Sequence, residues 1–261
     1  MSEIGPQVDY AVKRLPGSEE TKDLCAAFLD AVTEWPAGRS VTGLTLMNPF
    51  SDSDFAGQKV SIYDIRARDA RGRQFHLEMQ RLFTWGFPKR ALYYWADLHA
   101  RRLLQGDYYE TLLPTVSVCI LGQKALTDPG YHHCFTLRND HGTRFSNDIE
   151  IHTLELEKFD VPAERLSTAL ERWCYFLKHG ADIDPDSLPA TLDVPEIRQA
   201  LGVLAMLSQS ELERERVKAR ERAENDENSR RDALMLAERH FRDVGLEEGR
   251  DEGRREGEVV G

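Results

Sequence analysis

The stretch KVSIYDIRARDARGRQFHLEMQRL, residues 59–82, decides the fold because apolar and polar residues alternate on both sides of a turn. A period of two is typical of a strand whose two faces have different surroundings. The second alternating run, residues 75–82, follows the sequence DARGR at residues 69–73, where Gly72 suits the positive φ of a short hairpin loop. The pattern therefore predicts an antiparallel hairpin.

The hairpin register would bring two acidic residues together. If residues 70–72 form a three-residue loop, Asp69 faces Arg73 and Asp64 lies opposite Glu78 on one face. Like charges in this position are destabilising unless a cation lies between them, and carboxylate oxygens suit Mg²⁺ or Mn²⁺. Gln80 emerges on the same face, and its amide can orient a water molecule. A solvated acidic face without a metal is the alternative interpretation.

The remaining elements extend this hairpin into a mixed α/β fold. Residues 115–121 (TVSVCIL) are rich in β-branched side chains and lie between a proline and a glycine, which predicts a buried central strand. Helical periodicity predicts helices at residues 21–32, 87–105, 163–178 and 196–207. Strand patterns predict two further strands at residues 131–137 and 145–156. The order of these elements predicts an α/β fold with a mixed sheet flanked by helices.

The C-terminal part of the chain differs in composition. We expect a core over residues 1–180, a charged helical extension over 181–235, and a Glu/Arg/Gly-repeat tail over 236–261, partly flexible because glycine recurs at every fourth position. A narrow apolar stripe at a spacing of three and four residues indicates a surface that packs against a partner helix, and hence a homo-oligomer. Its residues are Leu234, Ala237, Phe241 and Val244.

Composition excludes several classes of protein. The chain has 261 residues, 41% of them hydrophobic, which excludes collagen-like and wholly disordered proteins. No apolar run approaches the ~20 residues of a membrane span, and no basic segment followed by an apolar stretch opens the chain, so we expect a cytoplasmic protein. The formal net charge of −11 argues against a nonspecific polyanion binder but leaves room for a local basic surface.

The cysteines and paired histidines give no metal motif along the sequence. Cys25, Cys119, Cys134 and Cys174 are scattered, without a Cys-x-x-Cys or a Cys/His cluster at metal-ligand spacing, and are expected to be reduced core residues. His132-His133 and Asp140-His141 lie beside turn sequences and are interpreted as surface polar residues.

Several motifs, in order and spacing, carry a resemblance that covers nearly the whole chain. The sequence resembles the PD-(D/E)XK nuclease family transposases, also called the recombination-promoting nuclease/putative transposase family, in the motifs NPF (48–50), SIYDIRARD (61–69), FHLEMQ (75–80), KRALYYW (89–95), YH (131–132), IEIH (149–152), ERW (171–173) and FL (176–177).

The resemblance implies a restriction-endonuclease-like core that cuts DNA phosphodiesters with a divalent metal, Mg²⁺ or Mn²⁺. Asp64 matches the motif aspartate and Glu78 the acidic residue of the following strand, so both are expected metal ligands and catalytic residues. Gln80 is the third expected catalytic residue, and it stands where the wider superfamily has lysine. Asp9 is similar to an N-terminal acidic residue of the family, although Val12 replaces the usual phenylalanine nearby.

The resemblance also indicates a DNA-binding surface next to the hairpin. Arg90 and Tyr94 match the helix that follows it, where a guanidinium can contact a phosphate, and they are expected accessory residues. The aromatic run at residues 93–95 is equally compatible with core packing. Cations that border the expected site are candidate DNA contacts, namely Arg66, Arg68, Lys89, Arg101 and Arg102.

The function predicted from the sequence is a metal-dependent DNA endonuclease associated with recombination or mobile elements. Because glutamine in place of lysine removes a positive charge from the site, a catalytically inactive, nuclease-derived DNA-binding protein is one alternative. An interaction protein that works through its charged C-terminal region is another.

Overall fold

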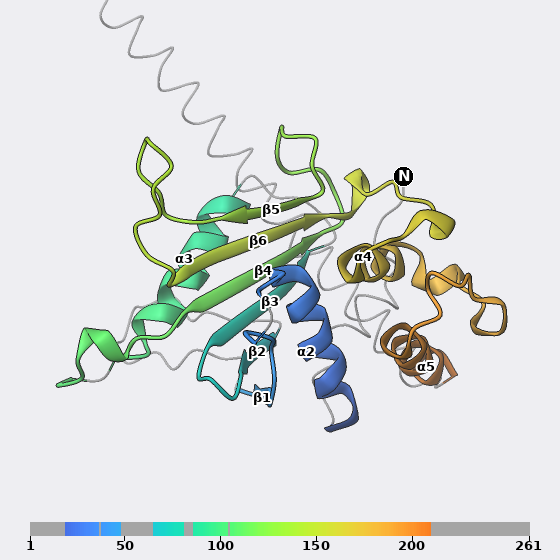
Figure 1. The fold of residues 1–261 in the computed structure, drawn as a ribbon, viewed down its shortest axis with the longest axis horizontal. Coiled ribbons are helices and arrows are strands. Elements are labelled where there is room, and N and C mark those ends of the chain that lie inside the picture. The colour runs from blue at the N-terminus through green and yellow to red at the C-terminus, as the bar shows by residue number, and fades with distance from the viewer. Residues whose placement is uncertain (1–18, 37, 48–64, 81–85, 104, 210–261) are drawn as a thin grey trace, which may run out of the picture. The chain divides into compact units, whose positions relative to one another are not determined.

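The computed structural model describes residues 19–36, 38–47, 65–80, 86–103 and 105–209, which form a mixed sheet with helices on both faces (Figure 1). The strands are β1 (Thr45–Leu46), β2 (Ile65–Arg68), β3 (Gln74–Gln80), β4 (Thr115–Leu121), β5 (His132–Phe135) and β6 (Ile149–Glu155). The α-helices are α2 (Glu19–Thr33), α3 (Phe87–Ala100), α4 (Ala169–His179) and α5 (Pro195–Gln209). Short 3₁₀ turns occur at Tyr109–Thr111, Leu156–Lys158, Ala163–Arg165, Gly180–Asp182 and Pro185–Ser187.

The six strands have the order β1-β2-β3-β4-β6-β5. The central strands β3, β4 and β6 run parallel, while β2 is antiparallel to β3 and β5 is antiparallel to β6. All seven residues of β4 are buried, as expected for a parallel strand covered on both faces. The central strand predicted at residues 115–121 is confirmed with its bounds.

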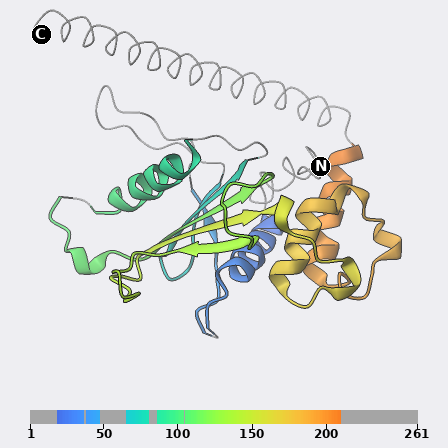
Figure 2. The same ribbon diagram turned by 90° about the horizontal axis from the view of Figure 1, so that it is seen from above.

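Helices cover the two faces of the sheet unequally (Figure 2). Val116, Val118 and Ile120 of β4 point into a large core that also contains the apolar residues of α2, α4 and α5. The alternate residues Cys119 and Leu121 lie in a smaller cluster with the first turns of α3. The sheet therefore separates α3 from the other three described helices.

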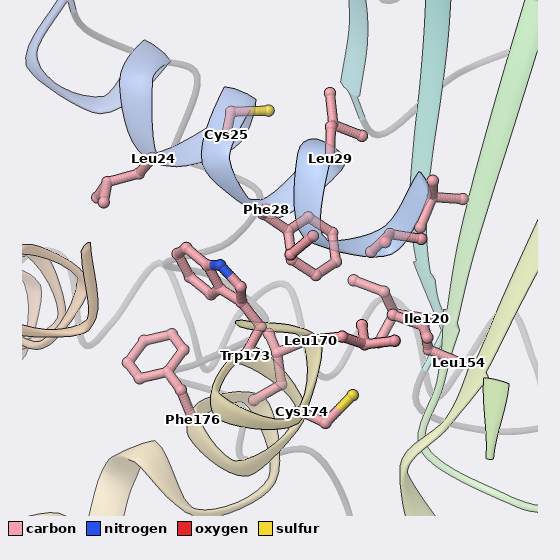
Figure 3. Close-up of a cluster of buried hydrophobic side chains, with 14 of the residues drawn as sticks. Leu24, Cys25, Phe28, Leu29, Ile120, Leu154, Leu170, Trp173, Cys174 and Phe176 are labelled. Atoms are coloured by element: carbon pink, nitrogen blue, oxygen red, sulfur yellow. The ribbon is translucent and has the colours of Figure 1, made fainter. Parts of the chain in front are cut away.

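The large core is built where α2 and α4 meet on one face of the sheet (Figure 3). Phe28 of α2 and Trp173 of α4 pack edge to face, with ring centroids 5.5 Å apart. Ile120 and Leu154 contribute from the strands, and both are completely buried. Truncation of an aromatic residue in such a core costs about 3–5 kcal/mol.

The start of α4 differs from the helix predicted at residues 163–178. Residues 163–165 form a 3₁₀ turn, and the α-helix begins only at Ala169. The cause is a capping box, in which the Thr168 hydroxyl accepts from the Glu171 amide at 3.1 Å and the Glu171 carboxylate accepts from the Thr168 amide at 3.0 Å. This arrangement satisfies amide groups that have no partner inside the helix.

Two other differences are local. The helix predicted over 87–105 ends at Ala100, where the amides of Arg101 and Arg102 donate to Asp97 and His99 and close a turn. The two-residue strand β1 was not predicted, because it is too short to show alternation. The predictions for residues 210–261, including the stripe from Leu234 to Val244, lie outside the described residues.

The cysteine prediction is correct for three residues and wrong for one. Cys25, Cys119 and Cys174 are buried thiols, and burial raises the pKa of Cys25 to about 12. Cys134 is exposed because it lies on β5, one of the two edge strands of the described sheet. No helix in the described part of the chain is long and apolar enough to cross a membrane.

Candidate active site

The β2–β3 turn is held by a buried ion pair. Asp69 accepts from the Nε of Arg73 at 2.6 Å, and both side chains are almost fully buried. Gly72 has a φ of +80°, and its amide donates to the Asp69 carbonyl at 2.9 Å. The three-residue loop predicted at residues 70–72 is therefore present, with Asp69 facing Arg73.

This turn fixes the register that the sequence predicted. Ile65 pairs with Leu77 and Arg66 pairs with His76 along the described part of the hairpin. Glu78 and Gln80 continue β3 on the face that carries His76, away from the large core. Asp64, which precedes Ile65, and Asp9 lie outside the described residues, so the structure does not test their placement.

Of the acidic residues predicted for the site, Glu78 is the one that lies in the described part of the chain. Its side chain is 12% exposed, and its Oε1 accepts from the Nη2 of Arg90 at 2.9 Å. Its Oε2 is buried and receives no hydrogen bond from any residue that the structure describes. Burying an acceptor without a donor destabilises the fold by about 1–3 kcal/mol, and by more when the acceptor is charged. A cation or an additional donor bound to this oxygen would therefore be stabilising.

Arg90 connects Glu78 with Gln80. Its Nη2 donates to the Oε1 of Gln80 as well as to Glu78, so one guanidinium nitrogen bridges both side chains. The helix places Arg90 there because α3 begins at Phe87, and the buried Phe87 and Ala91 dock its first turns onto the sheet. No spacing rule links a strand residue with a helix residue across a loop, so the sequence did not indicate this contact.

Tyr94 lies one turn further along α3. Its ring contacts the buried His76 edge to face, with centroids 5.8 Å apart, and it is half-buried. Trp95 donates from its indole to the Thr115 carbonyl at 2.8 Å, whereas Tyr93 is 45% exposed. Of the aromatic run 93–95, Trp95 therefore serves packing and Tyr93 faces outward.

The predicted DNA-contacting cations fall into two groups. Lys89 and Arg68 are exposed, and Arg66 is half-buried on the same face of β2 as Arg68. Arg101 pairs with Asp97 on its own helix at 2.8 Å. Arg102 donates to the carbonyls of Gly72 and Pro114, and burial together with the nearby Arg68 lowers the pKa of its guanidinium.

The residues present suit a divalent cation. The buried Oε2 of Glu78 is a hard oxygen ligand that no described residue donates to, and Mg²⁺ and Mn²⁺ prefer carboxylate and water oxygens. The ion pair with Arg90 is made through the Oε1 of this carboxylate, so its Oε2 is available to a cation. The donor chemistry of the site is therefore compatible with the metal that the fold implies.

Comparison with known protein families covers most of the chain. Residues 6–233 match the family described as PD-(D/E)XK nuclease family transposase. The chain belongs to this family. No curated protein and no solved structure matches the chain significantly.

Membership of the PD-(D/E)XK family agrees with the six-stranded mixed sheet, which is consistent with a restriction-endonuclease-like fold. The fold predicted from the sequence is thus confirmed. PD-(D/E)XK nucleases generally use divalent metals, and a nuclease/transposase family implies a DNA substrate. The matched span includes every residue that the sequence nominated for the site.

Proposed function

We propose that this family member is a metal-dependent DNA endonuclease, acting in recombination or in the movement of mobile elements. The observation that carries the proposal is the environment of Glu78. One of its oxygens is paired with Arg90, and the other is buried without a donor among the described residues. A carboxylate in this state suits a metal ligand better than a structural ion pair, in which both oxygens are normally satisfied.

Asp64 and Glu78 are the proposed metal ligands. The described register pairs Ile65 with Leu77. Asp64 precedes Ile65 in the sequence and Glu78 follows Leu77, so we propose that the same register continues and brings the two carboxylates together. Bound Mg²⁺ or Mn²⁺ would polarise the scissile phosphate and lower the pKa of a water molecule. Asp9 is proposed as an accessory acidic residue.

Gln80 and Arg90 have complementary roles in this proposal. The Gln80 amide can donate to and accept from a water molecule and so position the attacking nucleophile, but it has no charge. Arg90 supplies the positive charge beside it, where negative charge develops on the phosphate during attack. The contact between the two side chains supports this division of roles.

The DNA would approach from the side of Lys89 and Arg68. Both cations are exposed: Lys89 directly precedes Arg90 in α3, and Arg68 is on the face of β2 that pairs with the Glu78 face of β3. Phosphate contacts by lysine and arginine provide most of the affinity of nonspecific DNA binding. Arg66, Arg101 and Tyr94 are proposed as further contacts. Homo-oligomer formation through the C-terminal stripe is a separate proposal, which sedimentation of the intact chain tests.

The test is cleavage of supercoiled plasmid and linear duplex in Mg²⁺, Mn²⁺, Ca²⁺ or EDTA. Cleavage should require Mg²⁺ or Mn²⁺ and be abolished by Asp64→Ala and Glu78→Ala, with folding checked by circular dichroism. The matched control is Glu110→Ala, which removes an exposed carboxylate from the turn Tyr109–Thr111. Unchanged cleavage by either active-site variant would refute the assignment.

A second candidate is a DNA-binding protein that has lost cleavage. The bridge from Arg90 to Glu78 and Gln80 favours it, because a guanidinium can balance the carboxylate without a metal. In that case the wild-type chain would bind duplex DNA and yield no product with any divalent ion. DNA binding would then be insensitive to Glu78→Gln.

A further inference from the structure

Three side chains that could ligate a metal come together on β5 and β6. These two strands form one edge of the sheet (Figure 1). Cys134 of β5 lies directly opposite His152 of β6, and Glu150 precedes His152 by two residues, so all three point to one face. The Sγ of Cys134 lies 3.7 Å from the Nε2 of His152, and that nitrogen lies 3.6 Å from the Oε2 of Glu150. The ligand atoms of the three residues all lie within 4.8 Å of one another.

These separations are those of ligands around a shared metal. Zinc binds sulfur at about 2.3 Å and imidazole nitrogen or carboxylate oxygen at about 2.0–2.2 Å, so tetrahedral neighbours lie about 3.3–3.6 Å apart. The sulfur–nitrogen distance of 3.7 Å and the nitrogen–oxygen distance of 3.6 Å differ from these values by a few tenths of an ångström at most. Small side-chain rotations would close the site.

The chemistry of the donors selects the metal. A thiolate, an imidazole and a carboxylate together suit Zn²⁺, whereas Mg²⁺ prefers oxygen ligands alone. We propose that Cys134, Glu150 and His152 form a Zn²⁺ site with one open coordination position. Cys134 is the solvent-exposed ligand of this site, while Glu150 and His152 are buried.

Neighbouring side chains hold the ligands in place. The Nδ1 of His152 lies 3.1 Å from the Nε2 of His132. If this Nδ1 carries the proton and donates it in a hydrogen bond to His132, the Nε2 of His152 is left with a lone pair for the metal. Glu150 accepts from the Arg144 guanidinium at 2.7 Å and from the Trp35 indole at 3.1 Å. An outer shell of this kind orients metal ligands and fixes the tautomer of the imidazole.

The zinc site is independent of the proposed nuclease centre. Leu154, two residues beyond His152, is in the large core with α2 and α4, whereas Glu78 lies on the α3 face. The two sites are therefore on opposite faces of the sheet. The metal would join the short edge strand β5 to β6, so its effect on the molecule is measured as stability.

The experiment measures metal content in the full chain, prepared without a polyhistidine tag. The protein is stripped with a chelator, dialysed against Zn²⁺ and analysed by elemental mass spectrometry, with Co²⁺ as a spectroscopic substitute. We expect about one zinc per chain, a thiolate-to-cobalt charge-transfer band, and a Tm that rises with Zn²⁺. Cys134→Ala should remove all three signals, and its exposed position makes a folding defect avoidable.

Two control variants distinguish this site from the buried thiols and from the nuclease centre. Cys25→Ala removes a buried thiol of α2, and Glu78→Gln removes the proposed nuclease ligand; both should retain the zinc and the cobalt band. Glu150→Gln should weaken zinc binding. A wild-type chain that takes up no zinc and gives no cobalt band, or a Cys134→Ala variant that retains both, would overturn the proposal whatever the nuclease assay shows.

Discussion

Replacement of Arg73 by methionine should destabilise the protein more than any exposed substitution in the same turn. The guanidinium donates to Asp69 at 2.6 Å and to the carbonyls of Arg39 and Ser40 at 2.7 and 3.1 Å. It also lies 4.1 Å from the centre of the Trp35 ring. Methionine keeps most of the buried volume but leaves the Asp69 carboxylate without its counter-charge.

The expected cost is about 3–5 kcal/mol, the usual penalty for removing one partner of a buried ion pair. This is a large fraction of the ~5–15 kcal/mol by which domains are stable. The cost should appear as a lower urea midpoint with an unchanged m-value. The double variant Asp69→Asn/Arg73→Met should recover part of it, because no uncompensated buried charge remains.

The control is Arg71→Met, two residues away in the same turn. Arg71 is exposed and donates to the Gly38 carbonyl, so its loss should change stability by about 0.5 kcal/mol or less. An Arg73→Met variant that loses less than about 1 kcal/mol would contradict the argument that this ion pair holds the turn and its register.

Three further predictions concern the site and its support. Arg90→Gln should reduce plasmid cleavage by about 10²–10³-fold while Arg90→Lys retains more activity, and equal rates in single-turnover assays would show that the charge is not used. Thr168→Ala should lower the free energy of unfolding by about 0.5–2 kcal/mol because the Glu171 amide loses its acceptor, and an unchanged thermal midpoint would refute the role of the cap. Lys89→Ala and Arg68→Ala should each reduce the salt slope of DNA binding by about one, and fluorescence anisotropy at several salt concentrations would detect an unaltered slope.

The sequence predicted the sheet well where local patterns decide the structure. The alternation in residues 59–82 and the glycine of the turn define the hairpin without tertiary information, and the observed pairing of Ile65 with Leu77 and of Arg66 with His76 follows the predicted register. The strand at residues 115–121 was identified because a charge-free β-branched run is stable only when it is buried.

The parts that sequence reasoning missed depend on contacts between distant residues. The family resemblance nominated Arg90 as an accessory residue, but its contact with Glu78 depends on how a helix docks beside a strand, which no periodicity encodes. Cys134 and His152 are 18 residues apart and meet only through the β5–β6 register, so a search for ligand spacing along the chain cannot find them. The capping box at Thr168 is visible as a Thr-x-x-Glu pattern in the sequence. The helical periodicity that begins before it, at residue 163, led to a predicted helix that starts too early.

The central position of β4 has a consequence for how the chain reaches its native state. Its seven residues carry no charge, proline or glycine, and both partner strands are distant in sequence. Such pairings form late, because a large loop must close before they contribute any stability. Until then the segment is an exposed, strongly β-forming stretch of the kind that drives intermolecular aggregation. Pro114 and Gly122 flank it and limit its extension, so overexpression at low temperature should raise the soluble yield by slowing synthesis relative to folding.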